Sequence, residues 1–177
     1  MDPSEFQAFL SSRRSVREYD EASGISEEEK DYLLSAASTC PTAGNLEAWD
    51  VVIVSDEGQL EALMDATGGQ RQMVDAGCAF VVCANYVRSM SRYGERGILY
   101  AVQDATIAAT YIMLAAHAIR LQTCWMGAFD EDAVKEILEL PAHIRPVAIL
   151  SIGAGPIPAK GPERMDPEEH AHYDYWD

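Results

Sequence analysis

Positive charge is scarce in this chain. Its 177 residues include 13 Lys and Arg against 29 Asp and Glu, and the formal net charge is −16 at pH 7. A surface of that sign repels the phosphates of nucleic acids and of anionic membranes, so we expect neither as a partner. One cluster stands out against this background, because three of the basic residues fall within the five positions Arg13 to Arg17.

Cysteine is also rare, and its spacing excludes two common kinds of site. The four cysteines are Cys40, Cys78, Cys83 and Cys124. No two form a C-x-x-C pair, and three lie in apolar or strand-like stretches, which favours reduced buried thiols over a disulfide framework or a zinc site. Cys40 lies in a polar loop with no histidine nearby in the sequence, which argues against a thiol nucleophile. His170 and His172 lack a convincing third ligand, so we expect no metal site.

The chain has no Pro- or Ser-rich linker, low-complexity run or fixed-period repeat. A length of 177 residues suits one domain, residues 1–177. The opening Met-Asp-Pro-Ser-Glu has neither the basic start nor the apolar run of a signal peptide, so we expect a soluble, cytoplasmic protein. The longest apolar stretch approaches membrane-spanning length, but Gln103, Asp104 and His117 are among the polar residues that make insertion costly.

That apolar stretch, residues 103–120, predicts the central helix of the protein. No residue between Ala105 and Ile119 carries a fixed charge, and alanines alternate with large apolar side chains. A helix that is apolar on all sides is buried on all sides, and small residues let other backbones approach closely. We therefore expect other elements, or a second copy of the chain, to cover it. A Gly-containing turn then places Trp125 and Met126 beside free N–H groups, where a flat ligand could lie; an ordinary aromatic turn is the alternative.

The basic cluster indicates a phosphate site. Arginine forks and the Ser15 hydroxyl are the charge-assisted and neutral donors that a phosphate monoester needs. The alternative is a solvated basic turn that pairs with the acidic residues after it, which are Glu18, Asp20 and Glu21.

Helical spacing and capping signals predict further helices at residues 4–10, 26–37, 59–66 and 130–138. Short apolar runs rich in β-branched residues predict strands at 50–55, 78–84 and 146–153. Between the second helix and the first strand lies a loop of breakers and small polar residues, 39–45, and such a connection is a common place for a ligand contact.

Five motifs in this order resemble those of the nitroreductase family and cover nearly the whole chain. They are Arg13 to Tyr19, Cys40 to Asn45 with Trp49, Asp104 at the head of the apolar helix, Thr123 to Phe129, and Pro146 to Gly153. The resemblance implies an α+β nitroreductase-like fold, with a central mixed, mostly antiparallel sheet flanked by helices. It also implies an obligate homodimer with two FMN sites at its interface. Tyr173, Tyr175 and Trp176 make the tail too aromatic for a free acidic segment, so we expect a C-terminal arm, about 156–177, that packs on the partner subunit.

The resemblance also implies roles for particular residues. The FMN phosphate would be held by Arg13, Ser15 and Arg17, with Arg14 adjacent, and by a basic residue near the C-terminus, Arg164 or less surely Lys160. The proline loop would reach the flavin of the other subunit through Pro41, Thr42 and Asn45. Backbone N–H groups near the flavin N5 and O4 would come from Gly127 and Ala128, beside Trp125 and Met126.

Two departures from the family pattern bear on the expected chemistry. The usual Gln-Pro before the tryptophan is Glu47-Ala48 here, and Gln72 stands where a Lys or Arg often faces the flavin N1 and C2 carbonyl. A neutral amide stabilises an anionic reduced flavin less than a cation does.

The expected reaction passes reducing equivalents from NAD(P)H through FMN to an electron-poor acceptor, such as a nitroaromatic or a quinone, by a ping-pong mechanism. In this scheme the cofactor carries the chemistry, and no side chain is a covalent catalyst. Two alternatives stay open: a flavin protein dedicated to reductive dehalogenation or flavin processing, and a non-enzymatic dimeric binding protein.

Overall fold

The computed structural model describes residues 2–20 and 24–176, and its strands form one four-stranded antiparallel sheet in the order β1-β2-β4-β3. The strands are β1 Trp49–Val54, β2 Ala79–Asn85, β3 Gln122–Met126 and β4 Ile144–Gly153. Three of them confirm the predicted strands. A single parallel bridge between Ser15 and Thr123 adds a short stretch of chain beyond the edge strand β3.

Strand β3 corrects the prediction of a turn around Trp125 and Met126. Both residues are paired in the sheet, Trp125 with Leu150 and Met126 with Ile149, and the turn begins only at Gly127. The β-branched and aromatic residues of this stretch favour a strand. Strand β3 follows the apolar helix almost at once. The apolar residues of the helix and of the strand therefore form one continuous run in the sequence, and the pattern did not separate the two elements.

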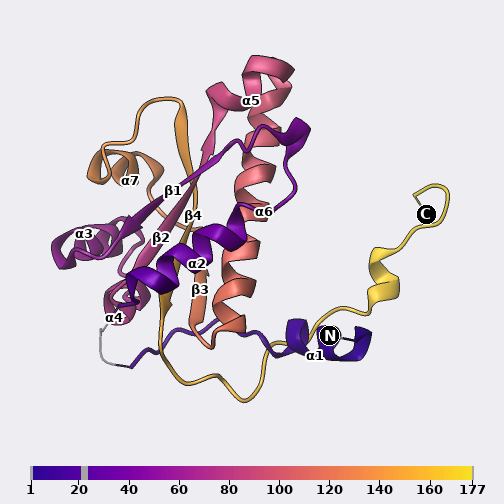
Figure 1. Cartoon of the computed structure of the whole chain (residues 1–177), viewed down its shortest axis with the longest axis horizontal. Coiled ribbons are helices and arrows are strands. Elements are labelled where there is room, and N and C mark those ends of the chain that lie inside the picture. The colour runs from indigo at the N-terminus through magenta and orange to yellow at the C-terminus, as the bar shows by residue number, and fades with distance from the viewer. Residues whose placement is uncertain (1, 21–23, 177) are drawn as a thin grey trace.

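Helices cover both faces of the sheet, as Figure 1 shows. The helices of the described residues are α1 Pro3–Ser12, α2 Glu27–Ala37, α3 Glu57–Ala66, α4 Gln72–Ala76, α5 Tyr86–Tyr93, α6 Arg96–Ala118 and α7 Glu131–Ile137, with 3-10 turns at Ala43–Asn45 and Pro167–His170. Successive side chains of a strand point to opposite faces. Phe80 and Val82 of β2 therefore pack in the core with α2 and α6, whereas Val81 and Cys83 pack in the second core with α3, α4 and α7.

The capping signals in the sequence are confirmed at two helices. Ser26 and Glu29 form a capping box at the start of α2, and Asp130 caps α7. The sequence did not predict α4 or α5, and it began the central helix at residue 103 instead of Arg96. Both helices are short of long apolar runs at this point of the chain, and Gly94 with φ of 55° separates them.

Helix α6 is not buried on all sides within one chain. Its buried positions are mostly alanines facing the sheet and α2, whereas Thr106 and Thr110 are exposed. By length and composition the helix could cross a membrane, and 33% of its most apolar window is buried. It packs along the sheet, so it is a core helix with one uncovered side.

Helix α1 and the C-terminal segment both extend away from the sheet on the same side of the molecule (Figure 1). Helix α1 has no buried residue, and residues 156–176 are all exposed, with Tyr173 82% and Trp176 85% accessible. An exposed aromatic segment of this kind needs a surface to cover it. The packing of the arm on a partner subunit therefore stays a prediction.

Candidate functional site

A basic pocket of about 750 Å³ lies where the segment after α1 meets the C-terminal arm. It brings together six of the residues predicted for the phosphate site: Arg13, Arg14, Ser15, Arg17, Lys160 and Arg164. Residues 13–17 and residues 160–164 are more than a hundred positions apart in the sequence, so the fold creates this concentration of cations. Pro158, Gly161 and Pro162 complete the wall on the side of the arm.

The segment that carries the arginines is fixed to the edge of the sheet. Val16 is buried, and its N–H donates to the carbonyl of Thr123 at 3.0 Å. The Tyr19 hydroxyl hydrogen bonds to Ser151 Oγ on β4 at 2.8 Å. These contacts leave Arg13 and Arg17 on either side of an anchored residue, so their positions are set by the sheet.

The arm approaches the arginines closely at Gly161. A Cβ on this glycine would lie 3.0 Å from Arg14 Nε. Arg14 is itself folded back on the end of α1, where its Nη1 donates to the carbonyls of Ser11 and Arg13. Arg14 therefore joins the helix end to the arm as well as adding charge to the pocket.

The pocket has cationic donors that no anion within residues 2–20 and 24–176 satisfies. Arg13 Nη1 and Arg14 Nε are buried and have no hydrogen-bond partner among the described residues. Burial lowers the pKa of Arg13, and the neighbouring cations Arg164 and Arg14 lower it further. Over residues 2–20 and 24–176, no carboxylate lines this pocket. Buried polar groups require partners, so the pocket fits an external anion such as a phosphate monoester.

The alternative of a solvated basic turn fails for the residues that can be placed. Glu18 and Asp20 are exposed and form no ion pair with the arginines, and Glu21 lies outside the described residues.

The proline loop, residues 40–48, lies beside the N-terminal half of α6, away from the basic pocket. Thr42 Oγ1 accepts a hydrogen bond from the Glu47 N–H at 3.1 Å, which closes a turn. Within that turn Gly44, Asn45 and Glu47 all have positive φ, at 61°, 57° and 49°. Pro41 and Thr42 line a separate, mainly apolar pocket of about 500 Å³ beside α6.

Two helices hold this loop in its unusual conformation. Asp104 of α6 accepts hydrogen bonds from the N–H groups of Ala43 at 2.9 Å and Ala48 at 3.2 Å. From α5, Arg88 donates to the carbonyl of Glu47, and Arg92 donates to that of Gly44 at 3.3 Å. The sequence assigned Asp104 no role, although a single carboxylate in an apolar helix is a usable signal of one.

The predicted flavin-edge turn follows β3. Gly127 and Ala128 are exposed, and the Ala128 carbonyl accepts a hydrogen bond from Gln70 Nε2 at 3.2 Å. Gln72, the residue predicted to face the flavin, begins α4. The side-chain amide that contacts this turn is thus that of Gln70, two positions earlier.

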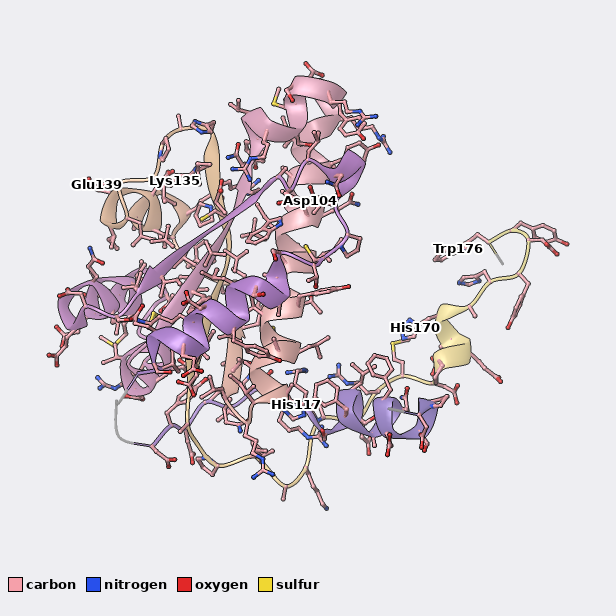
Figure 2. The ribbon with its side chains drawn as sticks, viewed as in Figure 1. Asp104, His117, Lys135, Glu139, His170 and Trp176 are labelled. Carbon is pink, nitrogen blue, oxygen red and sulfur yellow. The ribbon has the colours of Figure 1, made fainter. Side chains whose placement is uncertain are left out.

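The basic pocket and the proline loop do not meet within one chain. Asp104 lies under the loop, whereas His117 hydrogen bonds to Ser12 at 2.8 Å beside the pocket. Figure 2 shows these two residues on separate parts of α6. They are 13 positions apart, which corresponds to about 20 Å along a helix. The structure therefore presents two partial sites.

The cysteines take no evident part in either partial site. All four are free and buried. Burial raises the pKa of Cys40, Cys78 and Cys124, and it raises the pKa of Cys83 to about 12. The thiolate is the reactive form of cysteine, so these thiols are poor nucleophiles. Among the described residues, no group of three or more His, Cys, Asp or Glu side chains could hold a metal ion.

Comparison with known proteins identifies the relatives of this chain. The family model described as the nitroreductase family matches residues 10–70 and 62–154. A protein of Archaeoglobus fulgidus assigned as an NADH dehydrogenase/NAD(P)H nitroreductase is 31% identical over 145 residues, which cover 80% of each chain. The FMN reductase (NADPH) of Bacillus subtilis is 27% identical over 154 residues, or 79% of this chain and 61% of that protein.

Solved structures share the fold. The structure of NfrA1 from B. megaterium aligns with a TM-score of 0.89 and 24% identity, covering 98% of this chain and 75% of that one. The FMN-dependent nitroreductase of Clostridium difficile R20291 aligns with a TM-score of 0.76 and 24% identity, over 95% of this chain and 98% of that one. Both show the same α+β arrangement.

Proposed function

Because the chain belongs to the nitroreductase family of oxidoreductases, we propose that it binds FMN and passes reducing equivalents from NAD(P)H to an electron-poor acceptor such as a nitroaromatic or a quinone. Relatives named as NADPH-dependent nitroreductases and FMN reductases support this class of reaction. Bound FMN would supply the redox chemistry, and the residues of this chain would bind and orient it.

The observation that carries the proposal is the unsatisfied basic pocket. In a chain of net charge −16, five cations and the Ser15 hydroxyl line one pocket, and two buried guanidinium nitrogens have no partner in the part of the chain that the structure describes. A phosphate monoester accepts several charge-assisted hydrogen bonds and would satisfy both nitrogens. Arg13, Arg14 and Arg17 would bind the FMN phosphate from one side, and Lys160 and Arg164 from the arm.

The other predicted contacts act on the flavin ring in this proposal. The exposed backbone of Gly127 and Ala128 would donate N–H groups to the ring edge, with Trp125 and Met126 fixed in β3 beside them. Gln72 would face the N1 and C2 carbonyl side as a neutral amide. A neutral group leaves the reduced, anionic flavin less stabilised than a lysine would, and this favours a lower reduction potential.

A homodimer would complete the site. One side of α6 is uncovered, the arm is exposed along its whole length, and the proline loop is about 20 Å along the helix from the basic pocket. If two chains pack along α6, Pro41, Thr42 and Asn45 of one chain can reach the flavin held by the basic pocket of the other. Burial of α6 and of the aromatic arm would give the apolar area that an obligate interface needs.

FMN titration and a turnover assay test the proposal. We expect the purified protein to be yellow, to bind one FMN per chain, and to oxidise NADPH or NADH when a nitroaromatic or quinone is supplied under anaerobic conditions. A colourless protein that shows no flavin absorbance after incubation with excess FMN would contradict it. Flavin binding without turnover of these acceptors would favour reductive dehalogenation or flavin processing, which a panel of halogenated phenols and free flavins separates.

A further inference from the structure

Asp104 is a buried carboxylate whose placement neither packing nor charge pairing explains. It is 2% exposed and lies on the apolar face of α6 among Ala101, Ala105 and Ala108. Within the described part of the chain it forms no ion pair. A buried charge is costly unless hydrogen bonds satisfy it, so its two partners define what it does.

Both partners belong to the backbone of the proline loop. Oδ1 accepts from the Ala43 N–H and Oδ2 from the Ala48 N–H, so the two oxygens of one side chain hold both ends of the turn. Between these points the chain passes through three residues with positive φ, two of them, Asn45 and Glu47, not glycine. Such conformations cost free energy and persist only where the surroundings fix them.

We propose that Asp104 is a positioning residue for the flavin site of the partner subunit, acting through the proline loop. Its carboxylate fixes the Ala43 and Ala48 amides and thereby sets where Pro41, Thr42 and Asn45 project. This inference rests on the proposed function, because it takes the loop to be the element that reaches the flavin. Arg88 and Arg92 of α5 donate hydrogen bonds to carbonyls of the same loop. Asp104 has the complementary role, because it accepts hydrogen bonds from N–H groups of the loop.

The variant Asp104→Asn tests this role at nearly constant volume. Its amide oxygen can accept one loop N–H, but its NH₂ group opposes the other, which leaves that amide unpaired. We expect kcat/KM for the acceptor to fall about tenfold, while the dissociation constant for FMN changes less than threefold, because the phosphate pocket lies about 20 Å farther along α6, beyond His117. Hydrogen exchange of the Ala43 and Ala48 amides should become at least tenfold faster.

A matched control removes a carboxylate that caps a helix elsewhere. Asp56 accepts the Gln59 N–H at 3.0 Å at the start of α3. Asp56→Ala, which removes the cap, should lower stability while leaving kcat/KM and the exchange of the loop unchanged. If Asp104→Asn lowered stability but left kcat/KM and the exchange of the loop unchanged, the role of Asp104 would be structural only and the inference would be wrong.

Two further outcomes separate this inference from the proposed function. If the wild-type protein bound no FMN, the proposed function would fail, and unchanged loop exchange in Asp104→Asn, measured without flavin, would still overturn the positioning role. If Asp104→Asn did not fold, Asp104→Glu keeps the charge and both acceptors but moves them by one methylene. Lower kcat/KM with FMN affinity retained would then support the inference, and unchanged kcat/KM would overturn it.

Discussion

Arg13 is a partly buried cation whose charged neighbours are other cations, although the chain as a whole is acidic. Its guanidinium is partly buried, and its Nη1 has no partner among the described residues. An arginine on an acidic surface would normally find a carboxylate, but here Arg14 and Arg164 are its charged neighbours. The repulsion between these cations raises the free energy of the empty pocket, and a bound phosphate would relieve it.

We therefore expect Arg13→Ala to weaken FMN binding much more than riboflavin binding. Loss of a charge-assisted hydrogen bond costs about 1.5 to 3 kcal/mol, or roughly ten- to a hundredfold in affinity. Fluorescence titration with both flavins measures the difference. Lys30→Ala removes the same charge from α2, where Lys30 pairs with Glu27, and serves as the control. Equal losses for the two flavins in Arg13→Ala would place Arg13 away from the phosphate.

His117 gives a prediction on pH. Its ring packs on Phe9 with centroids 4.9 Å apart, and its Nε2 is 2.8 Å from Ser12 Oγ, which docks α1 on the end of α6. Burial, followed by the charge of Arg13, lowers the pKa of His117 below its usual 6.5. Because the pKa is depressed in the folded state, neutral His117 contributes stability that is present above about pH 6.5 and is lost as the pH falls through the folded-state pKa.

Urea unfolding of the wild-type protein and of His117→Gln over about pH 5 to 8 tests this linkage. Stability of the wild-type protein should decline more steeply toward acidic pH than that of the variant, which has no imidazole to protonate. Parallel pH profiles would show that His117 keeps an ordinary pKa in the folded protein.

At the scale of elements, the site depends on how α5 and α6 pack. The two helices are joined at Gly94, and both provide groups that hold the proline loop. Gly97 makes their close approach possible, because a Cβ at this position would lie 2.7 Å from the Met90 N and 2.8 Å from its Cα. These neighbours are backbone atoms of α5, so they cannot move aside as a flexible side chain can.

Gly97→Ala should therefore destabilise the protein by about 1 to 3 kcal/mol through overpacking, despite the better helix propensity of alanine. Gly58→Ala in α3 is the matched control, since the nearest atom to its added Cβ would be Asp56 Oδ1 at 3.4 Å. That substitution should be neutral or stabilising by up to about 1 kcal/mol. Urea unfolding compares the two, and equal stability of Gly97→Ala and wild type would mean that α5 can shift without cost.

At the scale of the whole molecule, the structure presents two half-sites and two uncovered apolar features. The basic pocket lies near the C-terminal end of α6 and the proline loop beside its N-terminal half, and the arm that carries Lys160 and Arg164 has exposed aromatic residues at Tyr173, Tyr175 and Trp176. Figure 2 shows His170 and Trp176 on this arm, well away from the sheet. A second copy of the chain would cover the uncovered surfaces and join each pocket to a loop.

Complementation between two inactive variants tests this shared site. Arg13→Ala and Asn45→Ala are unfolded together and refolded, so that mixed dimers form. If the loop of one chain serves the pocket of the other, a mixed dimer has one site with both lesions and one site with neither. It should regain about half the activity of a wild-type dimer.

Mass spectrometry confirms whether mixed dimers are present. If mixed dimers are present but activity does not recover, Arg13 and Asn45 of the same chain serve one flavin. A strictly monomeric protein with full FMN occupancy would remove the basis for a shared site altogether.

Local signals in the sequence determined most of the secondary structure and the residues of the basic pocket. Capping boxes, β-branched runs and helical spacing act over a few residues, so α2, α7, β1, β2 and β4 could be read directly. Arg13 to Arg17 were identified as a group for the same reason, because a cluster of cations in an acidic chain is visible without a fold. Strand β3 and helix α5 were missed, since their state depends on pairing with β4 and packing against α6.

Only the tertiary structure decided how these parts relate to one another. It brought Lys160 and Arg164 to the arginines, placed the Gln70 amide against the turn after β3, and put the Asp104 carboxylate beneath the proline loop. Each of these contacts joins residues far apart in the chain, and no local propensity specifies them. They follow from burial of the two faces of the sheet, which fixes where every loop and chain end can lie.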